Sequence, residues 1–278
     1  MSSNPIFPSL KGWEPTRDTL HWYIKGVGVI PRAHAVSQPK WWHISLKVQP
    51  DGLVTEPMRL PDDHTFYLFT NLREHRVTLT TSRGEKRDFS MLEGLTSKKF
   101  AQELLAAMED LGLSGDYAHK KYDNSDPRRY DPEMAERYLM ALLNVDRIFK
   151  QHRNNLSGEK GPVQLWPHGF DLAFEWFGAR TVEYEEGGEV TTYPSQLNLG
   201  FSPGDSSHPE PYFYSNPFPF EADKLVDKPL PEDASWHTEG WQGTILPYDA
   251  LVEDERAADR LLEYARGVYE ICEPILMA

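Results

Sequence analysis

The sequence predicts an α+β fold built from two similar halves. Segments with the apolar spacing of helices are interspersed with short segments in which apolar and polar residues alternate, as they do in strands. The links between the strand segments are short, which favours antiparallel pairing. Each half has the order helix, strand with a W-x-H motif, three more strands and helix. We therefore predict two α-β4-α units with mostly antiparallel sheets, related by an internal duplication.

The first half begins with a helix from residue 15 to about residue 30, although two glycines weaken its pattern. The segment WWHISLKVQ at 41–49 alternates, which predicts a strand. Its two faces are Trp42, Ile44, Leu46 and Val48 on one side and Trp41, His43, Ser45 and Lys47 on the other. Strands are also predicted at 64–71, 75–82 and 86–91. A helix capped by Thr96 and closed by Gly112 ends this half.

A polar connector leads to the second half, where Asp131 and Pro132 form a strong helix start. The segment 163–178 is predicted to be a long aromatic strand or a bent hairpin, and 196–202, 211–216 and 240–248 to be strands. The acidic run 184–189 is expected at a hairpin tip, and the Pro-rich stretch 217–235 in a surface loop. A helix from about residue 254 should stop at Pro274. The predicted boundaries are 1–115, a connector at 116–130, and 131–278, within one compact body.

Composition indicates a globular protein of the cytoplasm. Hydrophobic residues make up 39% of the chain, too many for a disordered protein. The net charge of −14, with no cluster of Lys and Arg, argues against nucleic acid or an anionic membrane as a partner. No apolar run reaches the ~18 residues of a membrane span, and the N-terminal residues lack the features of a signal peptide. The single cysteine, Cys272, excludes an internal disulfide, favours a reducing compartment and is expected to be buried.

Several well-known catalytic motifs are absent from the sequence. There is no GxxxxGK[ST], no GxGxxG after a strand, no GxSxG and no HExxH. These absences argue against P-loop NTPases, Rossmann dehydrogenases, α/β-hydrolases and zincins. The 10 histidines have no spacing typical of a metal site, so we predict no metal and leave the cofactor open.

Two histidines in W-x-H motifs, His43 and His168, are the first candidates for a functional site. His168 would lie in apolar surroundings, which disfavour its charged form and suit a base near neutral pH. The alternative, which we favour for each, is a hydrogen-bonded core histidine. Asn71 and Asn216 end matching strands and could fix a ligand or form turns, and Arg180 could hold a carboxylate or lie on the surface.

Six ordered motifs resemble the landmarks of a bacterial family known only as a domain of unknown function. They are TLHWYIKGVGVI, KWWHISL with DGLVT, GPVQLW with FDLAFEWFGAR, GFSPG, PYFYSNPFP and GTILPY, and the resemblance covers about residues 13–277. Matched positions are His21, Trp42, Phe170, Asp171, Arg180, Gly200, Pro203 and Tyr248, and His43 fits some members. The chain departs from the pattern at VQLWPHG and at Ser202. The resemblance therefore shifts the expected site from His168 towards His21, Asp171 and Arg180.

Two functions remain open. In the first, the protein is an enzyme or an enzyme-like binder of a small molecule, with His21 or His43 as acid or base, Asp171 orienting it and Arg180 contacting an anion. The pocket would then be completed by Trp22, Trp41, Trp166, His168, Asn71, Asn216 and Tyr248. In the second, the protein is a non-catalytic binding or interaction protein, as a monomer or a homodimer, with a Trp-rich core.

Overall fold

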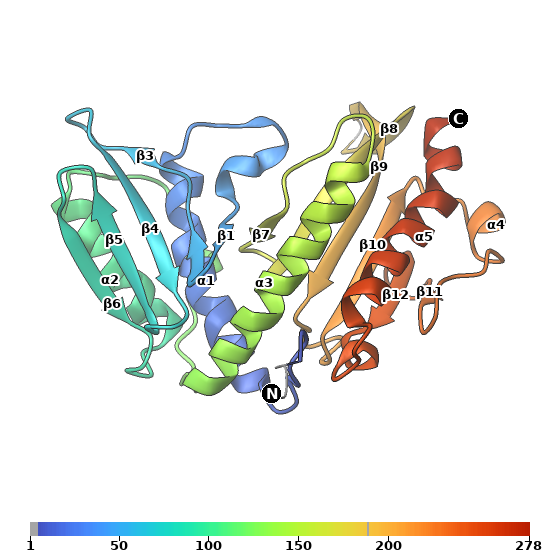
Figure 1. Ribbon diagram of the computed structural model, residues 1–278. Coiled ribbons are helices and arrows are strands. Elements are labelled where there is room, and N and C mark those ends of the chain that lie inside the picture. The colour runs from blue at the N-terminus through green and yellow to red at the C-terminus, as the bar shows by residue number, and fades with distance from the viewer. Residues whose placement is uncertain (1–4, 188) are drawn as a thin grey trace. The chain divides into compact units, whose positions relative to one another are not determined.

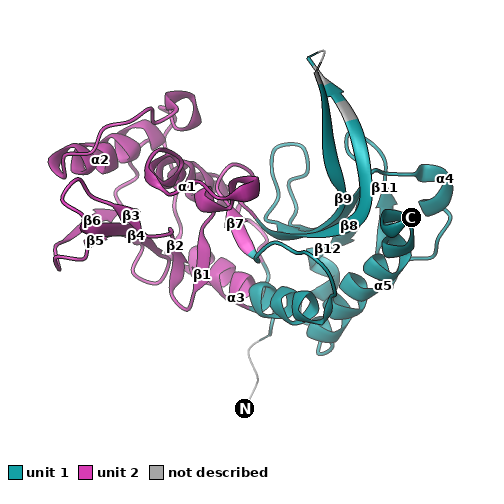
Figure 2. Cartoon of the chain, turned by 90° about the horizontal axis from the view of Figure 1, so that it is seen from above, with its two compact units in different colours: residues 1–9, 144–163, 172–278 teal, residues 10–143, 164–171 magenta. Residues whose placement is uncertain are grey.

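The computed structural model describes residues 5–187 and 189–278 (Figure 1). Packing divides the chain into two compact units (Figure 2). Unit 1 comprises residues 1–9, 144–163 and 172–278, and unit 2 comprises residues 10–143 and 164–171. The chain therefore passes between the units four times. The sequence-based division at 115 and 131, and the internal duplication, stay predictions.

Unit 2 has two complete α-helices beside an antiparallel sheet. The helices are α1 (Glu14–His34) and α2 (Ser97–Asp110). The strands are β1 (Lys47–Gln49), β2 (Gly52–Val54), β3 (Met58–Arg59), β4 (Thr65–Asn71), β5 (Arg76–Thr81) and β6 (Lys86–Ser90). They follow the order β1-β2-β4-β5-β6, with β3 paired to β4. Alternate residues of β4 and β5 are buried, which is the pattern of a sheet with one face on the core.

Helices α1 and α2 pack against each other through their apolar faces. The opposite face of α1 takes no part in this contact. Tyr23 of α1 stacks on Phe100 of α2, with ring centroids 4.1 Å apart. The Thr96 hydroxyl accepts a hydrogen bond from the backbone N–H of Lys99 at 3.3 Å, which confirms the predicted cap of α2. The predicted start of α3 (Pro132–Asn155) is also confirmed, because Asp131 Oδ1 accepts from the N–H of Glu133 at 2.9 Å. The second stretch of unit 2 contains β7 (Gln164–Trp166), which bridges to Leu46 through Leu165.

Unit 1 has a second antiparallel sheet, with strands in the order β11-β12-β10-β9-β8. These are β8 (Asp171–Glu186), β9 (Glu189–Ser202), β10 (Tyr212–Phe218), β11 (Ser235–His237) and β12 (Gly243–Pro247). Helix α5 (Ala257–Met277) lies against β9 and β10. The core of this unit includes Phe149, Phe174 and Phe213, and Cys272 is buried as predicted, with its thiol pKa raised to about 12 by burial.

The α+β class with mostly antiparallel sheets is confirmed, but the predicted strand at 41–49 is wrong. Residues Pro39–Ile44 form the 3-10 helix η1, and only Lys47–Gln49 is a strand. Lys40 and Trp41 have φ angles of 56° and 63°, in the left-handed region that a strand excludes. The expected strand faces therefore do not exist at Trp41 and His43.

Other element boundaries differ from the predictions in smaller ways. Helix α5 continues through Pro274 to Met277. The stretch 217–235 contains the short helix α4 (Ala222–Leu225). The short strands β2, β3 and β11 were not predicted. The hairpin of β8 and β9 pairs Glu186 with Glu189, and residue 188 at its tip lies outside the described residues.

Candidate functional site

The face of α1 away from α2 carries a row of polar and small residues. His21, Lys25, Gly28 and Arg32 recur at intervals of three or four, so they lie along one side of the helix. Residues 19–50 contain no Asp or Glu, although the chain has 43 of them. This side of α1 is therefore unusually basic for an acidic protein.

The turn formed by residues 167–170 is fixed to α1 at two points. At one point, a Cβ added to Gly28 would lie 2.6 Å from Cβ of Pro167, so only glycine allows this close approach. At the other, Nε2 of His21 lies 3.0 Å from the backbone oxygen of His168. A carbonyl can only accept, so Nε2–H of His21 is the donor. The His21 ring also stacks on Phe170, with centroids 5.5 Å apart.

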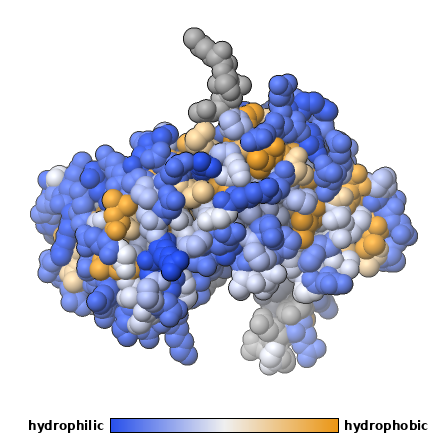
Figure 3. Space-filling view, turned by 90° about the horizontal axis from the view of Figure 1, so that it is seen from below, coloured by the Kyte–Doolittle hydropathy of each residue, from blue (hydrophilic) through white to orange (hydrophobic). Residues whose placement is uncertain are grey.

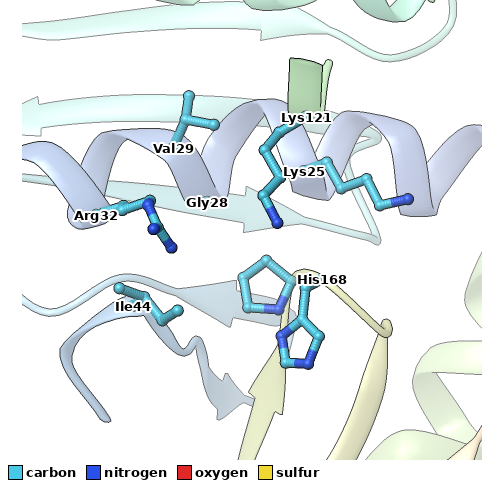
Figure 4. Close-up of a pocket in the computed structure, with 8 residues that line it drawn as sticks. Lys25, Gly28, Val29, Arg32, Ile44, Lys121 and His168 are labelled. Atoms are coloured by element: carbon cyan, nitrogen blue, oxygen red, sulfur yellow. The ribbon is translucent and has the colours of Figure 1, made fainter. Parts of the chain in front are cut away.

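Between this turn, α1, η1 and the 3-10 helix η2 (His119–Lys121) there is a cavity of about 90 Å³ (Figure 4). Its volume is well above the ~10–15 Å³ that one water molecule needs. The lining contains Lys25, Arg32, Lys121 and His168 as polar groups, with Gly28, Val29, Ile44 and Pro167 as the remainder. Figure 4 shows the Lys121 side chain extending towards the turn and the Arg32 guanidinium directed towards Ile44.

The three cations of the cavity lack acidic partners. No Asp or Glu lines the cavity, and within residues 5–187 and 189–278 none of the three forms an ion pair. Burial lowers the pKa of Lys25, and the positive charge of Lys121 lowers it further. Two of the cations lie on indole rings, with Lys25 Nζ 4.6 Å from the centroid of Trp22 and Arg32 Cζ 5.0 Å from that of Trp41.

His43 and His168, the candidates from the W-x-H motifs, lie in different surroundings. His43 is buried, its Nδ1 accepts from the N–H of Gln38 at 3.2 Å, and its ring stacks on Trp41. Burial lowers the pKa of His43, and Arg32 adds to the effect. His168 is exposed at the cavity and lies beside Trp166, with ring centroids 5.9 Å apart. It is His21 that contacts the backbone of His168, and burial lowers the pKa of His21 to about 4.

Asp171 directly follows the turn formed by residues 167–170. Its Oδ1 lies against Gly169, where an added Cβ would be 2.4 Å away. The carboxylate that raises the pKa of His21, against the larger effect of burial, belongs to Asp18. The role of Asp171 in orienting a histidine stays a prediction.

The other four predicted residues have structural partners away from this cavity. Arg180 pairs with Glu221 in unit 1. The Asn71 side chain accepts from the N–H groups of Arg73 and Glu74, which is a turn-forming role. Asn216 lies in β10, opposite Asn198 of β9. The Tyr248 hydroxyl is buried and donates to the backbone oxygen of Pro8 at 2.9 Å.

The sequence-based reasoning missed Lys25, Arg32 and Lys121. The acid-free window at 19–50 was a signal for the first two, because it combines basic residues with an absence of counter-charges. No comparable signal marks Lys121, which is brought to the cavity by the fold. In the described part of the chain, no group of three or more His, Cys, Asp or Glu residues is arranged to hold a metal ion. No helix of these residues has both the length and the apolar character needed to span a membrane.

Comparison with known proteins gives one match. The model of a family of unknown function (DUF5996) matches residues 6–274. No curated protein and no solved structure matches the chain.

Proposed function

For this chain, which belongs to a family of unknown function (DUF5996), we propose that unit 2 binds a small molecule through an anionic group in the α1 cavity. The observation that carries the proposal is that Lys25, Arg32 and Lys121 line one cavity that no carboxylate lines. Like charges held close together repel, and burial adds a desolvation cost for Lys25. A bound carboxylate or phosphate would offset both effects.

The chemistry of the three cations suits such a group. Arg presents a planar fork of donors that matches carboxylate and phosphate oxygens, and Lys supplies a point charge. Trp22 and Trp41 lie under two of the cations, which restricts where those side chains can go. Cations that are already held in place lose less conformational entropy when they bind a ligand.

A catalytic role, if the ligand is transformed, rests on His168. Its imidazole is exposed at the cavity, whereas Nε2 of His21 is engaged with a backbone carbonyl. His168 is thus the histidine placed to exchange a proton with a bound ligand, and His21 holds the turn that presents it.

The alternative role as a protein-interaction surface has less support. Large exposed apolar side chains come from separate segments, such as Val36, Leu92, Val190 and Val226. On the face shown in Figure 3, apolar residues form small groups on a mostly hydrophilic surface. A stable protein interface usually requires a larger contiguous patch.

The test measures binding of inorganic phosphate and of acetate to the full chain by NMR titration at low ionic strength. We expect Lys25→Gln and Lys121→Gln each to weaken binding about 5- to 10-fold, since tenfold corresponds to about 1.4 kcal/mol. Lys120→Gln is the matched control, because Lys120 belongs to the same 3-10 helix but does not line the cavity. Equal weakening in all three variants, or none in any, would contradict a specific site.

A further inference from the structure

The cavity has an apolar wall as well as its cations. Ile44 ends η1, and Pro167 begins the turn. These two residues come from separate parts of the chain and line the same space, whereas the side chain of Val29 points away from Ile44 and His168 (Figure 4). Gly28 adds backbone without a side chain, and its contact with Pro167 leaves no room for either element to move closer.

A fully hydrated inorganic anion would use the cations and leave this wall facing water. An apolar group placed against the wall would be removed from water together with it, and burial contributes about 0.8 kcal/mol per methylene. The wall therefore favours ligands that carry carbon next to their charge.

We infer that the ligand is a small amphipathic organic acid, with its anionic head beside the cations that line the cavity and a short apolar body against Ile44 and Pro167. The inference rests on the proposed anion binding and adds the class of ligand. The cavity of about 90 Å³ limits the body to a few carbons, because further ones extend into solvent.

The test is a homologous series of straight-chain carboxylates from acetate to hexanoate, titrated into the full chain by NMR. We expect affinity to rise about fourfold per methylene over the first two or three additions, the equivalent of about 0.8 kcal/mol each, and then to level off. Butyl phosphate is compared with pentanoate to identify the preferred head group. A preference for either one, with the chain-length effect retained, agrees with the inference.

One variant tests the wall. Ile44→Thr keeps the branching at Cβ but places a hydroxyl at the wall, so it should reduce the gain in affinity per methylene. Val36→Thr is the control, because Val36 is 74% exposed and does not line the cavity. Circular dichroism of each variant checks that it is folded.

The results of these titrations distinguish a failure of the amphipathic ligand class from a failure of anion binding itself. If affinity is the same along the series but still falls in Lys25→Gln, anion binding holds and the amphipathic ligand is wrong. If affinity rises with chain length but is indifferent to both lysine variants, the anion site itself is wrong. If neither the chain length nor the lysines matter, both proposals fail.

Discussion

His21 is a candidate acid or base in the sequence motif, and in the folded protein its ring forms structural contacts. Its Nε2–H donates to the backbone of His168 and its ring stacks on Phe170, so it fixes the turn beside the cavity. Burial lowers the pKa of His21 to about 4, and burial followed by the charge of Arg266 does the same for His152 in unit 1. Both histidines are therefore neutral in the folded protein near neutral pH.

These two histidines make stability depend on pH. Their folded pKa values lie below the ordinary histidine value of 6.5, so the unfolded chain binds more protons between pH 6.5 and about pH 4. The free energy of unfolding should therefore fall as the pH falls through that window. For His152, which is 3% exposed, the loss at pH 5 is about 2 kcal/mol.

Urea unfolding at pH 7.5 and pH 5.0 measures this loss. His152→Phe should reduce the difference between the two pH values, because a neutral ring remains among Phe174 and Tyr269. His64→Gln, at an exposed loop position, is the control. An unchanged difference in His152→Phe would show that another group causes the pH dependence.

At the scale of elements, α1 combines packing and binding on opposite sides. Tyr23 and Gly26 face α2, where Gly26 lies close to Ala101, while Lys25 and Gly28 face the cavity. Gly28 lowers the intrinsic stability of the helix, yet only a residue without Cβ allows Pro167 to lie against it. The cavity wall thus depends on Gly28, although glycine has a low helix propensity.

Gly28→Ala should be destabilising despite the higher helix propensity of alanine. Its Cβ would lie 2.6 Å from Cβ of Pro167, and overpacking of this kind costs about 1–3 kcal/mol against a propensity gain of about 1 kcal/mol. We also expect weaker anion binding, because the turn carrying His168 must move. The measurements are urea unfolding and the acetate titration.

Gly26→Ala is the matched control in the same helix. Its Cβ would be 3.3 Å from Cβ of Ala101, a milder contact on the side away from the cavity. It should leave the acetate affinity unchanged. If both variants weaken binding equally, the contact of Gly28 with Pro167 is not what shapes the cavity.

At the scale of the whole molecule, residues 6–8 pack into unit 1 together with segments far along the chain. Phe7 is fully buried and contacts the rings of Phe213 and Tyr248. Asn144 donates to the backbone oxygen of Ile6, and Tyr248 donates to that of Pro8. Segments more than a hundred residues apart in sequence therefore make one core.

Tyr248→Phe should affect stability and leave ligand binding intact. It removes the 2.9 Å hydrogen bond and leaves the Pro8 carbonyl without this donor, at a cost of about 1–2 kcal/mol. Thermal unfolding should show a lower Tm, with the acetate affinity of the variant equal to that of the wild type. A loss of acetate binding in a folded Tyr248→Phe protein would assign Tyr248 the ligand role predicted from the sequence.

Most of the fold could be predicted because its signals are local. The caps at Thr96 and Asp131 and the alternating residues of β4 and β5 lie within single elements. The segment at 41–49 was mispredicted because its alternation suits a strand, while the left-handed conformations of Lys40 and Trp41 are not visible in a pattern of polarity. Strands of two or three residues, such as β3, are too short to show a period.

The sequence by itself determined the α+β class and the main helices, since their caps and periodic patterns are local. Only the tertiary structure brought Lys121 and the 167–170 turn to the side of α1 that carries His21, Lys25 and Gly28, and gave Arg180, Asn71 and Tyr248 partners outside the cavity. The physical reason is the distance in sequence over which each signal acts. Periodicity acts between neighbours on one element, whereas a binding cavity depends on the packing of segments that are distant in sequence.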